Sequence, residues 1–532
     1  MPRKQMAGVA ASRRRPSATG HRFAVDTGGN VALRNIFATP RTRRLVMTQT
    51  TRRGRTATGP AVTVLLIAGA LSLATGCGDA AKTAAPQARN VIVILADDLG
   101  VADVSAYVGD RIPTPNIDRI AQGGVRFDAG YATAAMCSPS RAGLLTGRYQ
   151  NRFGFEYNAG SDERVEAEGL GLDVGERTMA DLLRAAGLYT GIIGKWHQGS
   201  RPEFAPIARG FEEFFGFYAG STNFIEPDLP GVINGESIEP RANASFWKQI
   251  LREPGRQVVN NADEYLTEEL TRETLEFLDR NADRPFFLYL AHAAPHTPLQ
   301  TTQKYYDRFP DIADERQRIY AAMVSALDDG VGAVLDRLDA LGLADDTLIV
   351  FLSDNGCAAY TNLCDCSLRG GKLTLLEGGT RIPFLMRWPR GLPAGRVYGH
   401  PVTALDVLPT VLRAVGASAP EGPRRDGVDL VPFVRGTTQG VPHETLYWRS
   451  EPLLAVRQGP WKLWESRDGA FSYLFDLSSD PGEQIDLAAS QPDRVRRLRE
   501  DFAAWSADLV APAWDPRNIV VNACGEEFRM GF

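Results

Sequence analysis

Residues 90–98 read Asn-Val-Ile-Val-Ile-Leu-Ala-Asp-Asp, an apolar and largely β-branched run that ends abruptly in two aspartates. A continuous apolar run of this length is typical of a strand that is buried on both faces of a sheet. Such strands belong to α/β proteins, in which helices cover both faces of a mostly parallel sheet. The run therefore predicts a central strand that ends in the acidic pair Asp97-Asp98.

Three further segments repeat this pattern of an apolar run followed by polar residues. Strands are expected at residues 188–193, 285–291 and 347–353, and the polar residues after them are Gly194-Lys195-Trp196-His197, His292 with Ala294-Pro295-His296, and Asp354-Asn355-Gly356. Helical patterns accompany them at about residues 115–121, 179–186, 262–280 and 316–341. Alternating helices and buried strands predict an α/β fold with a large mixed, mostly parallel sheet flanked by helices.

Hard oxygen ligands follow two of these strands. Because ligands of such sheets bind outside the carboxyl ends of the strands, the polar residues are expected to converge on one pocket. Asp97, Asp98, Asp354 and Asn355 would bring oxygen atoms there, which suit Ca²⁺ or Mg²⁺ rather than Zn²⁺. Each Asp alone would be interpreted as a helix cap or a turn residue. Two oxygen-rich pairs at one edge favour a cation site.

Positive and proton-transferring groups are predicted in the same pocket. Lys195 and His197 follow the second strand, His296 lies beyond the third, and Lys372 closes the run Arg369-Gly370-Gly371-Lys372. A pocket with a cation, two lysines and two histidines suits a small tetrahedral oxyanion ester. Phosphate and sulfate esters both fit this description.

Residues 132–147, Ala-Thr-Ala-Ala-Met-Cys-Ser-Pro-Ser-Arg-Ala-Gly-Leu-Leu-Thr-Gly, predict a short helix that begins near Cys137. Pro139 suits the first helical turn, and Gly147 suits a left-handed cap at the end. Unpaired N–H groups at a helix start favour an anion, and Arg141 adds a fixed positive charge one turn later. A single Cys is usually a buried core thiol, but the pattern around Cys137 favours a functional one.

The N-terminal region has a different composition. Residues 1–46 are basic and show no hydrophobic periodicity, so we expect disorder. From Met47, basic residues precede an apolar run at 61–74, which predicts a secretory signal over residues 47–77. Translation starting at Met47 would make residues 1–46 an upstream extension. Residues 78–89 read as a small-residue linker.

The end of the signal, Ala74-Thr75-Gly76-Cys77, resembles a bacterial lipoprotein cleavage box. Cys77 would then become a lipidated N-terminus, and plain export with cleavage nearby is the alternative. Either way an exported protein is expected, in the periplasm or at the cell surface. Contact with a membrane is expected only through a lipid anchor at Cys77.

The predicted catalytic domain spans residues 90–435, and the pattern changes after it. Short strands are expected at about 445–449, 453–457, 461–464 and 473–476, followed by a polar helix at 492–509. They predict a smaller α+β domain with an antiparallel sheet over residues 436–510. Residues 511–532 show no clear periodicity and are expected to form a tail. The chain has 59 Lys and Arg against 64 Asp and Glu, a formal net charge of −5, which argues against binding nucleic acid.

The run Cys137-Ser138-Pro139-Ser140-Arg141, continued by Leu144-Leu145-Thr146-Gly147, resembles the signature of the type I sulfatases of the alkaline phosphatase superfamily. The resemblance extends over about residues 90–487. It includes Leu99-Gly100, Gly194-Lys195-Trp196-His197, Ala294-Pro295-His296, Asp354-Asn355-Gly356, Arg369-Gly370-Gly371-Lys372, Leu474-Phe475-Asp476-Leu477 and Asp480-Pro481-Gly482-Glu483. Gln198 replaces a Leu that is frequent in the family, and we expect it not to touch the chemistry.

The resemblance implies an arylsulfatase-like hydrolase of aryl or carbohydrate sulfate esters. A formylglycine-generating enzyme would oxidise Cys137 to formylglycine, whose hydrated form attacks sulfur. The implied metal ligands are Asp97, Asp98, Asp354, Asn355 and residue 137, with Ca²⁺ as the ion and Mg²⁺ as the alternative. Lys195, Lys372 and His296 would stabilise the transferring group, His296 with Lys372 would protonate the leaving alcohol, and His197 would take the second diol proton.

Two other functions are compatible with the sequence. One is a formylglycine-dependent phosphonate monoester or phosphodiester hydrolase, which resembles this chain but typically carries His at the position of Asn355. The other is an inactive, surface-anchored binding protein on a sulfatase scaffold. Because every expected catalytic position is filled, we favour the hydrolase.

The remaining histidines and cysteines are assigned less specific roles. His292 is expected either to line the substrate pocket or to be structural, and His400 and His443 to pack or lie at the surface. Cys357, Cys364 and Cys366 favour a disulfide over a second metal site in an exported protein. Cys357 would pair with Cys364 or Cys366, and Cys524 would take the remaining partner.

The substrate pocket is expected to be bordered by residues 152–169, 200–247 and 357–366. Several aromatic and Arg side chains in these segments suit a sulfated sugar or a small aryl sulfate. Tyr157, Arg201, Tyr218 and Asn223 are the candidates for substrate contact.

Overall fold

The computed structural model describes residues 86–107, 111–159, 162–235, 249–259, 261–358 and 364–531, all within one unit that spans residues 82–532. The predictions for the leader 1–46, the signal segment 47–77 with Cys77, and linker residues 78–85 lie outside these residues. Parts of the predicted pocket border, 236–247 and 359–363, lie outside them as well. Among the described residues, no helix combines the length and the apolar character that crossing a membrane requires.

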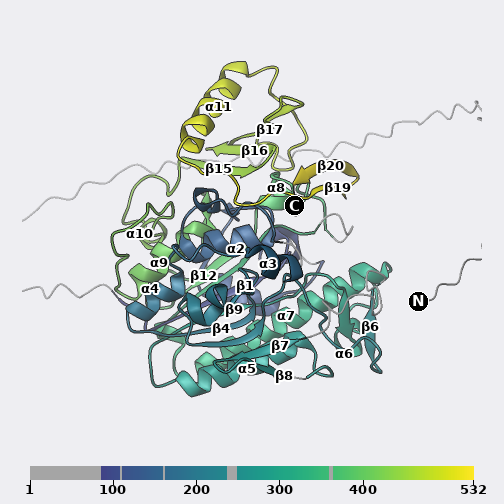
Figure 1. The fold of residues 1–532 in the computed structure, drawn as a ribbon, viewed down its shortest axis with the longest axis vertical. Helices are drawn as coiled ribbons and strands as arrows, with labels where there is room; N and C mark the ends of the chain where they lie inside the picture. Colours follow the sequence, from purple (N-terminus) through teal and green to yellow (C-terminus); the bar gives the residue numbers. More distant parts are fainter. Residues whose placement is uncertain are drawn as a thin grey trace, which may run out of the picture. The chain divides into compact units, whose positions relative to one another are not determined.

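A ten-stranded mixed sheet forms the centre of the molecule (Figure 1). Its five middle strands are parallel, in the order β11, β1, β9, β4, β5, and this confirms the predicted fold class. The full order is β13 (Arg396–Tyr398), β2 (Val125–Phe127), β12 (Phe384–Arg387), β11 (Thr347–Ser353), β1 (Asn90–Ala96), β9 (Phe286–Ala291), β4 (Tyr189–Lys195), β5 (Glu213–Phe217), β7 (Ile250–Glu253) and β8 (Gln257–Val259).

Strand β1 is buried on both faces, as its sequence predicts. Ile92 and Ile94 point into one hydrophobic cluster, and Val91, Val93 and Leu95 point into another, because successive side chains of a strand alternate between faces. The first cluster is covered by α1 (Pro115–Gln122), α5 (Leu266–Asn281) and α7 (Glu315–Ala340), and the second by α2 (Cys137–Thr146), α4 (Met179–Ala185) and α9 (Val407–Ala414).

Short elements connect these layers and leave the architecture unchanged. They are β3 (Gly130–Tyr131), α3 (Asp162–Glu168), β6 (Val232–Asn234), β10 (Gln300–Thr302), α6 (Gln303–Tyr306), α8 (Glu377–Thr380), β14 (Val402–Thr403) and α10 (Val431–Arg435).

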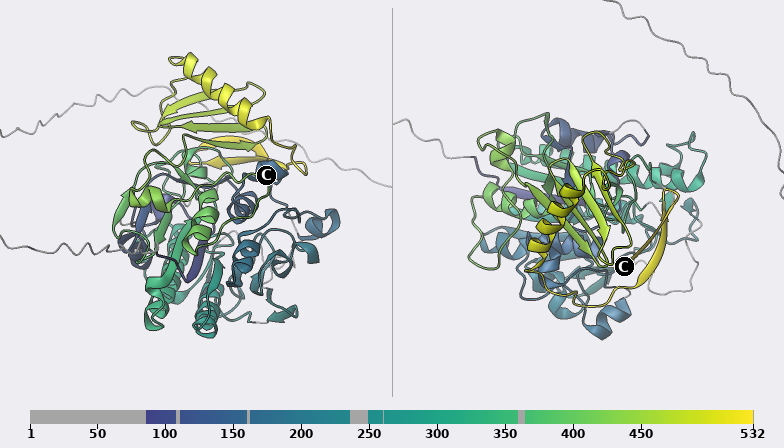
Figure 2. Two further views of the ribbon diagram at one scale, coloured as in Figure 1. Left: turned by 90° about the vertical axis from the view of Figure 1, so that its left-hand side faces the viewer. Right: turned by 90° about the horizontal axis from the view of Figure 1, so that it is seen from above.

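The predicted C-terminal domain is present as a four-stranded antiparallel sheet with one helix packed on it (Figure 2). Its elements are β15 (Thr445–Ser450), β16 (Leu453–Gln458), β17 (Trp461–Ser466), β18 (Ser472–Asp476) and α11 (Pro492–Ser506). One face of the sheet packs on Val495, Leu498 and Phe502 of α11. On the other face, Trp448 and Phe475 share a cluster with residues of the catalytic domain.

The expectation of an irregular tail over residues 511–532 is wrong. Strands β19 (Asn518–Ala523) and β20 (Glu526–Gly531) form a hairpin, joined by Cys524 and Gly525, which both have positive φ. Its apolar positions alternate and bury Val521 and Phe528, while Cys524 is bonded to Cys366. These stabilising contacts come from distant parts of the chain, so periodicity within 22 residues could not reveal them.

The structure resolves the cysteine pairing that the sequence left open. Cys357 pairs with Cys364, and Cys366 pairs with Cys524. The second bond ties the C-terminal hairpin to the segment that leads into Lys372. Among the described residues, Cys137 is the free cysteine.

His443, which lies outside the predicted pocket, makes the free energy of unfolding depend on pH. Burial lowers the pKa of His443, but the carboxylate of Asp406, 2.7 Å from Nε2, outweighs burial and raises it above the ordinary value. A raised folded-state pKa stabilises the protein fully below the unfolded-state pKa of about 6.5, and this stabilisation is lost as pH rises through the folded-state value.

We therefore expect wild-type protein to exceed His443→Gln by about 1 kcal/mol in free energy of unfolding below pH ~6 and by less in alkaline buffer. Urea unfolding of both proteins across this range measures the difference. A constant difference would mean that His443 contributes by packing alone.

Candidate active site

Neighbouring strands deliver the predicted polar residues to one edge of the sheet. Ala96 of β1 lies opposite Ser353 of β11, so Asp97 and Asp354 follow side by side. The amide of Asp354 donates to the carbonyl of Ala96 at 3.1 Å, which continues the sheet ladder past the last paired residues. The convergence that the strand endings predict is confirmed.

Cys137 is the first residue of α2, a helix whose ten residues are all buried. Gly147 caps this helix in the left-handed conformation, φ 65°, as predicted. The Cys137 Sγ lies 3.4 Å from Oδ1 of Asp97 and 3.0 Å from Nζ of Lys372. Burial, followed by the charge of Asp354, raises the pKa of the thiol. This shift favours the protonated thiol in the unmodified cysteine, whereas cysteine nucleophiles react as thiolates.

Three buried ion pairs surround Cys137. Lys195 Nζ lies 2.6 Å from Asp97, and Lys372 Nζ lies 2.8 Å from Asp98. Arg141 donates to one oxygen of Asp354 through Nε at 2.9 Å, with a second nitrogen at 2.8 Å. Three carboxylates thus face three cations, and their formal charges cancel.

Arg141 also joins three elements of the fold. From α2 it reaches Asp354 after β11, and its NH1 group donates to the carbonyl of Lys195 at the end of β4 at 3.1 Å. The side chain is fully buried. Arg141 therefore holds α2, the helix that begins with Cys137, against the ends of β11 and β4.

The pKa values of Asp97 and Asp354 are shifted in opposite directions. Burial raises the pKa of Asp97, but Lys195, His296 and Arg141 outweigh it, and the result lies below the ordinary value. Burial and then the charge of Asp97 raise the pKa of Asp354. A cation bound between these oxygens would relieve that repulsion.

The donor atoms fit a hard divalent cation. Ligand atoms of Asp97, Asp98, Cys137 and His296 lie within 4.8 Å of one another. Asn355 donates from Nδ2 to Asp98 at 2.7 Å, and its buried Oδ1 has no hydrogen-bond partner among the described residues. Carboxylate and amide oxygens are ligands that Ca²⁺ and Mg²⁺ prefer.

The predicted ligand set differs in two respects from the cluster of possible ligands that the structure forms, which lacks Asp354 and includes His296. Asp354 directs Oδ2 to Arg141, and its Oδ1 accepts from the amide of Asp98 at 3.3 Å. His296, which the sequence assigned to the transferring group, lies within the metal-ligating cluster, with Nε2 3.5 Å from Asp98.

The pKa values of both histidines of the site are lowered, which favours their neutral forms. Burial, and then the positive charges of Lys195 and Arg141, lower the pKa of His197 well below its ordinary value. Burial and then Lys372 lower the pKa of His296. The Nδ1 of His296 lies 2.5 Å from the carbonyl of Thr297, so this nitrogen carries the proton. A neutral His197 can accept a proton.

Some predicted residues lie elsewhere. His292 is fully buried, and burial lowers its pKa to about 4. Both its ring nitrogens lack a partner among the described residues, and a Cβ on Gly330 of α7 would lie 3.8 Å from the ring. This position supports the structural alternative. His400 is exposed and contacts Tyr398, in agreement with a surface role.

Three of the four candidate substrate contacts are engaged in contacts within the protein. Tyr157 and Tyr218 pack in the core, where their hydroxyl groups donate to the carbonyl of Glu451 and to the carboxylate of Glu253. Arg201 donates to backbone carbonyls that include that of Glu166. Aromatic composition alone could not distinguish these packing roles from substrate contact.

Sequence reasoning missed a residue that orders the start of α2. Asn158 accepts the amide hydrogen of Ser138 at 3.1 Å through Oδ1. It is buried in an irregular segment without periodicity, so no sequence signal marked it.

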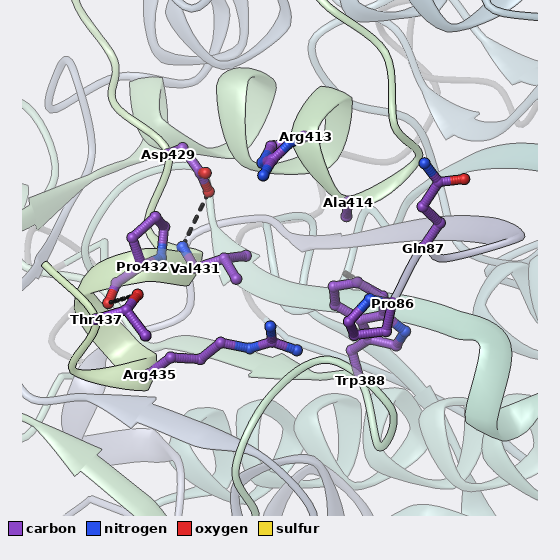
Figure 3. A pocket seen from close by; sticks show the side chains of 10 residues that line it. All are labelled: Pro86, Gln87, Trp388, Arg413, Ala414, Asp429, Val431, Pro432, Arg435 and Thr437. Atoms are coloured by element: carbon purple, nitrogen blue, oxygen red, sulfur yellow. Dashed lines mark hydrogen bonds between the residues drawn. The ribbon is translucent and has the colours of Figure 1, made fainter. Parts of the chain in front are cut away.

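A separate pocket of about 380 Å³ shares no residue with this site. Figure 3 shows Arg435 extending toward Trp388 and Pro86, with Arg413 and Asp429 on the other side. Asp429 accepts a hydrogen bond from the amide of Val431 at 3.0 Å. The pocket lies next to the start of β1, away from the carboxyl edge.

Comparison with known proteins identifies the family. A model of the sulfatase family matches residues 89–417. N-acetylgalactosamine-6-sulfatase of Canis lupus familiaris is 32% identical over 419 residues, covering 75% of this chain and 76% of the relative, and steryl-sulfatase of Mus musculus is 32% identical over 519 residues, covering 79% and 82%. The structure of Ps i-CgsB in complex with k-i-k-neocarrahexaose superimposes with a TM-score of 0.73 at 33% identity, covering 80% of this chain and 95% of the other.

The chain therefore belongs to the sulfatase family of the alkaline phosphatase superfamily. Its activity is that of a sulfuric ester hydrolase. Phosphonate monoester hydrolase of Agrobacterium radiobacter also superimposes, with a TM-score of 0.60 at 20% identity, covering 83% of this chain and 99% of the other. That likeness concerns the fold.

Proposed function

We propose that this protein is an exported hydrolase of sulfate esters, principally of sugars, that uses formylglycine made from Cys137 and a bound divalent cation. The observation that carries the proposal is the charge-balanced cluster of three carboxylates and three cations around residue 137. With a divalent cation bound, the pocket would carry two net positive charges. A released sulfate dianion has the charge that balances them.

The residues of the site would divide the reaction between them. Formylglycine in its hydrated form supplies a hydroxyl that attacks sulfur and a second hydroxyl whose deprotonation expels sulfate. Lys372 and Lys195 would lie where negative charge develops on the transferring group. The Nζ of Lys372 is 3.0 Å from the Sγ of Cys137. The neutral His197 would accept the second hydroxyl proton, and Lys372 would return a proton to the leaving alcohol. His296, which the sequence also assigned to this step, holds its one ring proton on Nδ1 against the carbonyl of Thr297, so it would act on the transferring group or the cation through Nε2.

A cation would be held by Asp97, Asp98, Asn355, residue 137 and either Asp354 or His296. When bound, it supplies Lewis-acid polarisation of the sulfate oxygens. We propose Ca²⁺, with Mg²⁺ as the alternative, because the ligands are oxygen-rich.

Modification of Cys137 would precede folding. The Cys137 side chain is 1% exposed, and every residue of its helix is buried. A formylglycine-generating enzyme would therefore have to reach Cys137 before the segment around it packs into the core.

Sugar sulfates are favoured as substrates by the relatives' names, N-acetylgalactosamine-6-sulfatase and a structure with a bound neocarrahexaose. The test compares kcat/KM for a sulfated monosaccharide, an aryl sulfate and an aryl phosphodiester in protein with confirmed formylglycine. We expect both sulfate esters to exceed the phosphodiester by at least about 100-fold. Preference for the phosphodiester would support the phosphonate and phosphodiester hydrolase alternative instead.

A further inference from the structure

The side-chain amide of Gln198 joins α2, the helix that begins with Cys137, to the segment that carries His197. Gln198 is fully buried. Its Nε2 lies 2.8 Å from the carbonyl oxygen of Ser138 and 2.7 Å from that of His197. An amide group carries two hydrogens, and each has one of these acceptors. One side chain thereby connects the neighbour of residue 137 to the proposed base.

The backbone of His197 is held from both sides. Its N–H donates to the carbonyl of Tyr218 at 3.0 Å, and its carbonyl accepts from Gln198 and from Oγ of Ser138, the latter at 2.7 Å. His197 has φ 55°, a left-handed conformation that costs free energy for a residue with a β-carbon. Surrounding contacts must therefore maintain it, and Gln198 supplies one of them.

The ring of His197 has fewer constraints than its backbone. Its Nδ1 is buried and has no hydrogen-bond partner among the described residues. Gly220 lies so close that a Cβ there would be 2.7 Å from Nε2. The direction of the ring thus follows from the backbone conformation and from this close contact, and an altered backbone would redirect it.

We propose that Gln198 is a positioning residue, which fixes the separation between residue 137 and His197 by binding both backbone segments. The role in catalysis rests on the proposed function of His197, whereas the role in holding the ring does not. The sequence led us to expect that Gln198 does not touch the chemistry; its two hydrogen bonds would nevertheless determine the geometry of the groups that do.

The first test is kinetic. Gln198→Leu removes both donors at similar volume, and we expect kcat for an aryl sulfate to fall about tenfold or more with KM changed less than about twofold. Formylglycine content is measured in each preparation so that kcat refers to matured protein. Gln150→Leu is the matched control, because Gln150 is equally buried and its Nε2 donates to one carbonyl, that of Thr133 at 3.1 Å. We expect the control to lose stability and keep kcat.

The second test needs no activity. Diethyl pyrocarbonate labels accessible, unprotonated histidines, and peptide mass analysis gives the labelling of His197 relative to the exposed His400. We expect Gln198→Leu to raise this ratio severalfold and Gln150→Leu to leave it unchanged. Gln198→Met provides a second variant of similar length if the Leu variant does not fold.

Gln198 variants that match Gln150→Leu in both kcat and labelling would overturn the proposal. If matured wild-type protein hydrolyses no sulfate ester, the proposed function fails. The labelling ratio then still decides whether Gln198 holds His197.

Discussion

Replacing Cys137 by Ser is expected to reduce kcat for an aryl sulfate by about 10⁴-fold or more, because it removes the precursor of formylglycine. A serine hydroxyl offers one oxygen for attack on sulfur and no second hydroxyl through which sulfate can be expelled. The substitution changes one buried atom within an otherwise unchanged helix, so the melting temperature should stay close to that of the unmodified Cys form.

Steady-state kinetics and thermal unfolding of Cys137→Ser check this expectation, with Cys137→Ala as the control that has no side-chain oxygen. Both variants should retain the three ion pairs, because none of these pairs uses the sulfur atom. A Ser variant within about tenfold of wild-type kcat would show that a hydroxyl suffices, and the formylglycine proposal would fail.

Replacing Lys372 by Met is expected to reduce kcat by about 10²–10³-fold, the usual effect of removing one donor that faces developing charge. Lys372 Nζ lies 3.0 Å from the Cys137 Sγ and 2.8 Å from Asp98, so the variant also leaves a buried carboxylate without this partner. The free energy of unfolding should fall as well, by about 3–5 kcal/mol. Two causes could therefore lower activity, and a control is needed to separate them.

Lys462→Met is the matched control, because Lys462 is a fully buried lysine that pairs with carboxylates outside the site. Its Nζ lies 2.9 Å from Glu377 and 3.1 Å from Glu483. We expect a similar loss of stability with kcat retained in the folded protein. Equal losses of kcat in Lys372→Met and Lys462→Met would mean that Lys372 acts through stability alone.

The fold was largely predictable because its central strands carry a local signal. The apolar runs at β1 and β11 are continuous, and the structure has strands over the predicted residues. The hairpin of β19 and β20 was missed because a distant disulfide and packing on Phe528 stabilise it. The disulfide pairing was likewise undecided, since spacing leaves several partners open.

The site was predictable where residues follow strand ends, since topology alone brings these together. Finer assignments were less accessible to sequence reasoning. Asp354 was predicted as a metal ligand, but its hydrogen bond from Arg141, 213 positions away in the chain, was not predicted. Gln198 was expected not to touch the chemistry, and the two hydrogen bonds that its amide donates to backbone carbonyls were not predicted. Such hydrogen bonds depend on three-dimensional packing that a linear motif does not encode.

In the proposed function, sulfate ester hydrolysis depends on formylglycine at position 137. The most direct test measures kcat/KM for an aryl sulfate in several preparations that differ in the converted fraction of Cys137, determined from the mass of its peptide and from reaction with an aldehyde probe. We expect activity proportional to that fraction and none in fully unmodified protein. Activity that does not vary with conversion, or a fully converted protein without turnover, would contradict it.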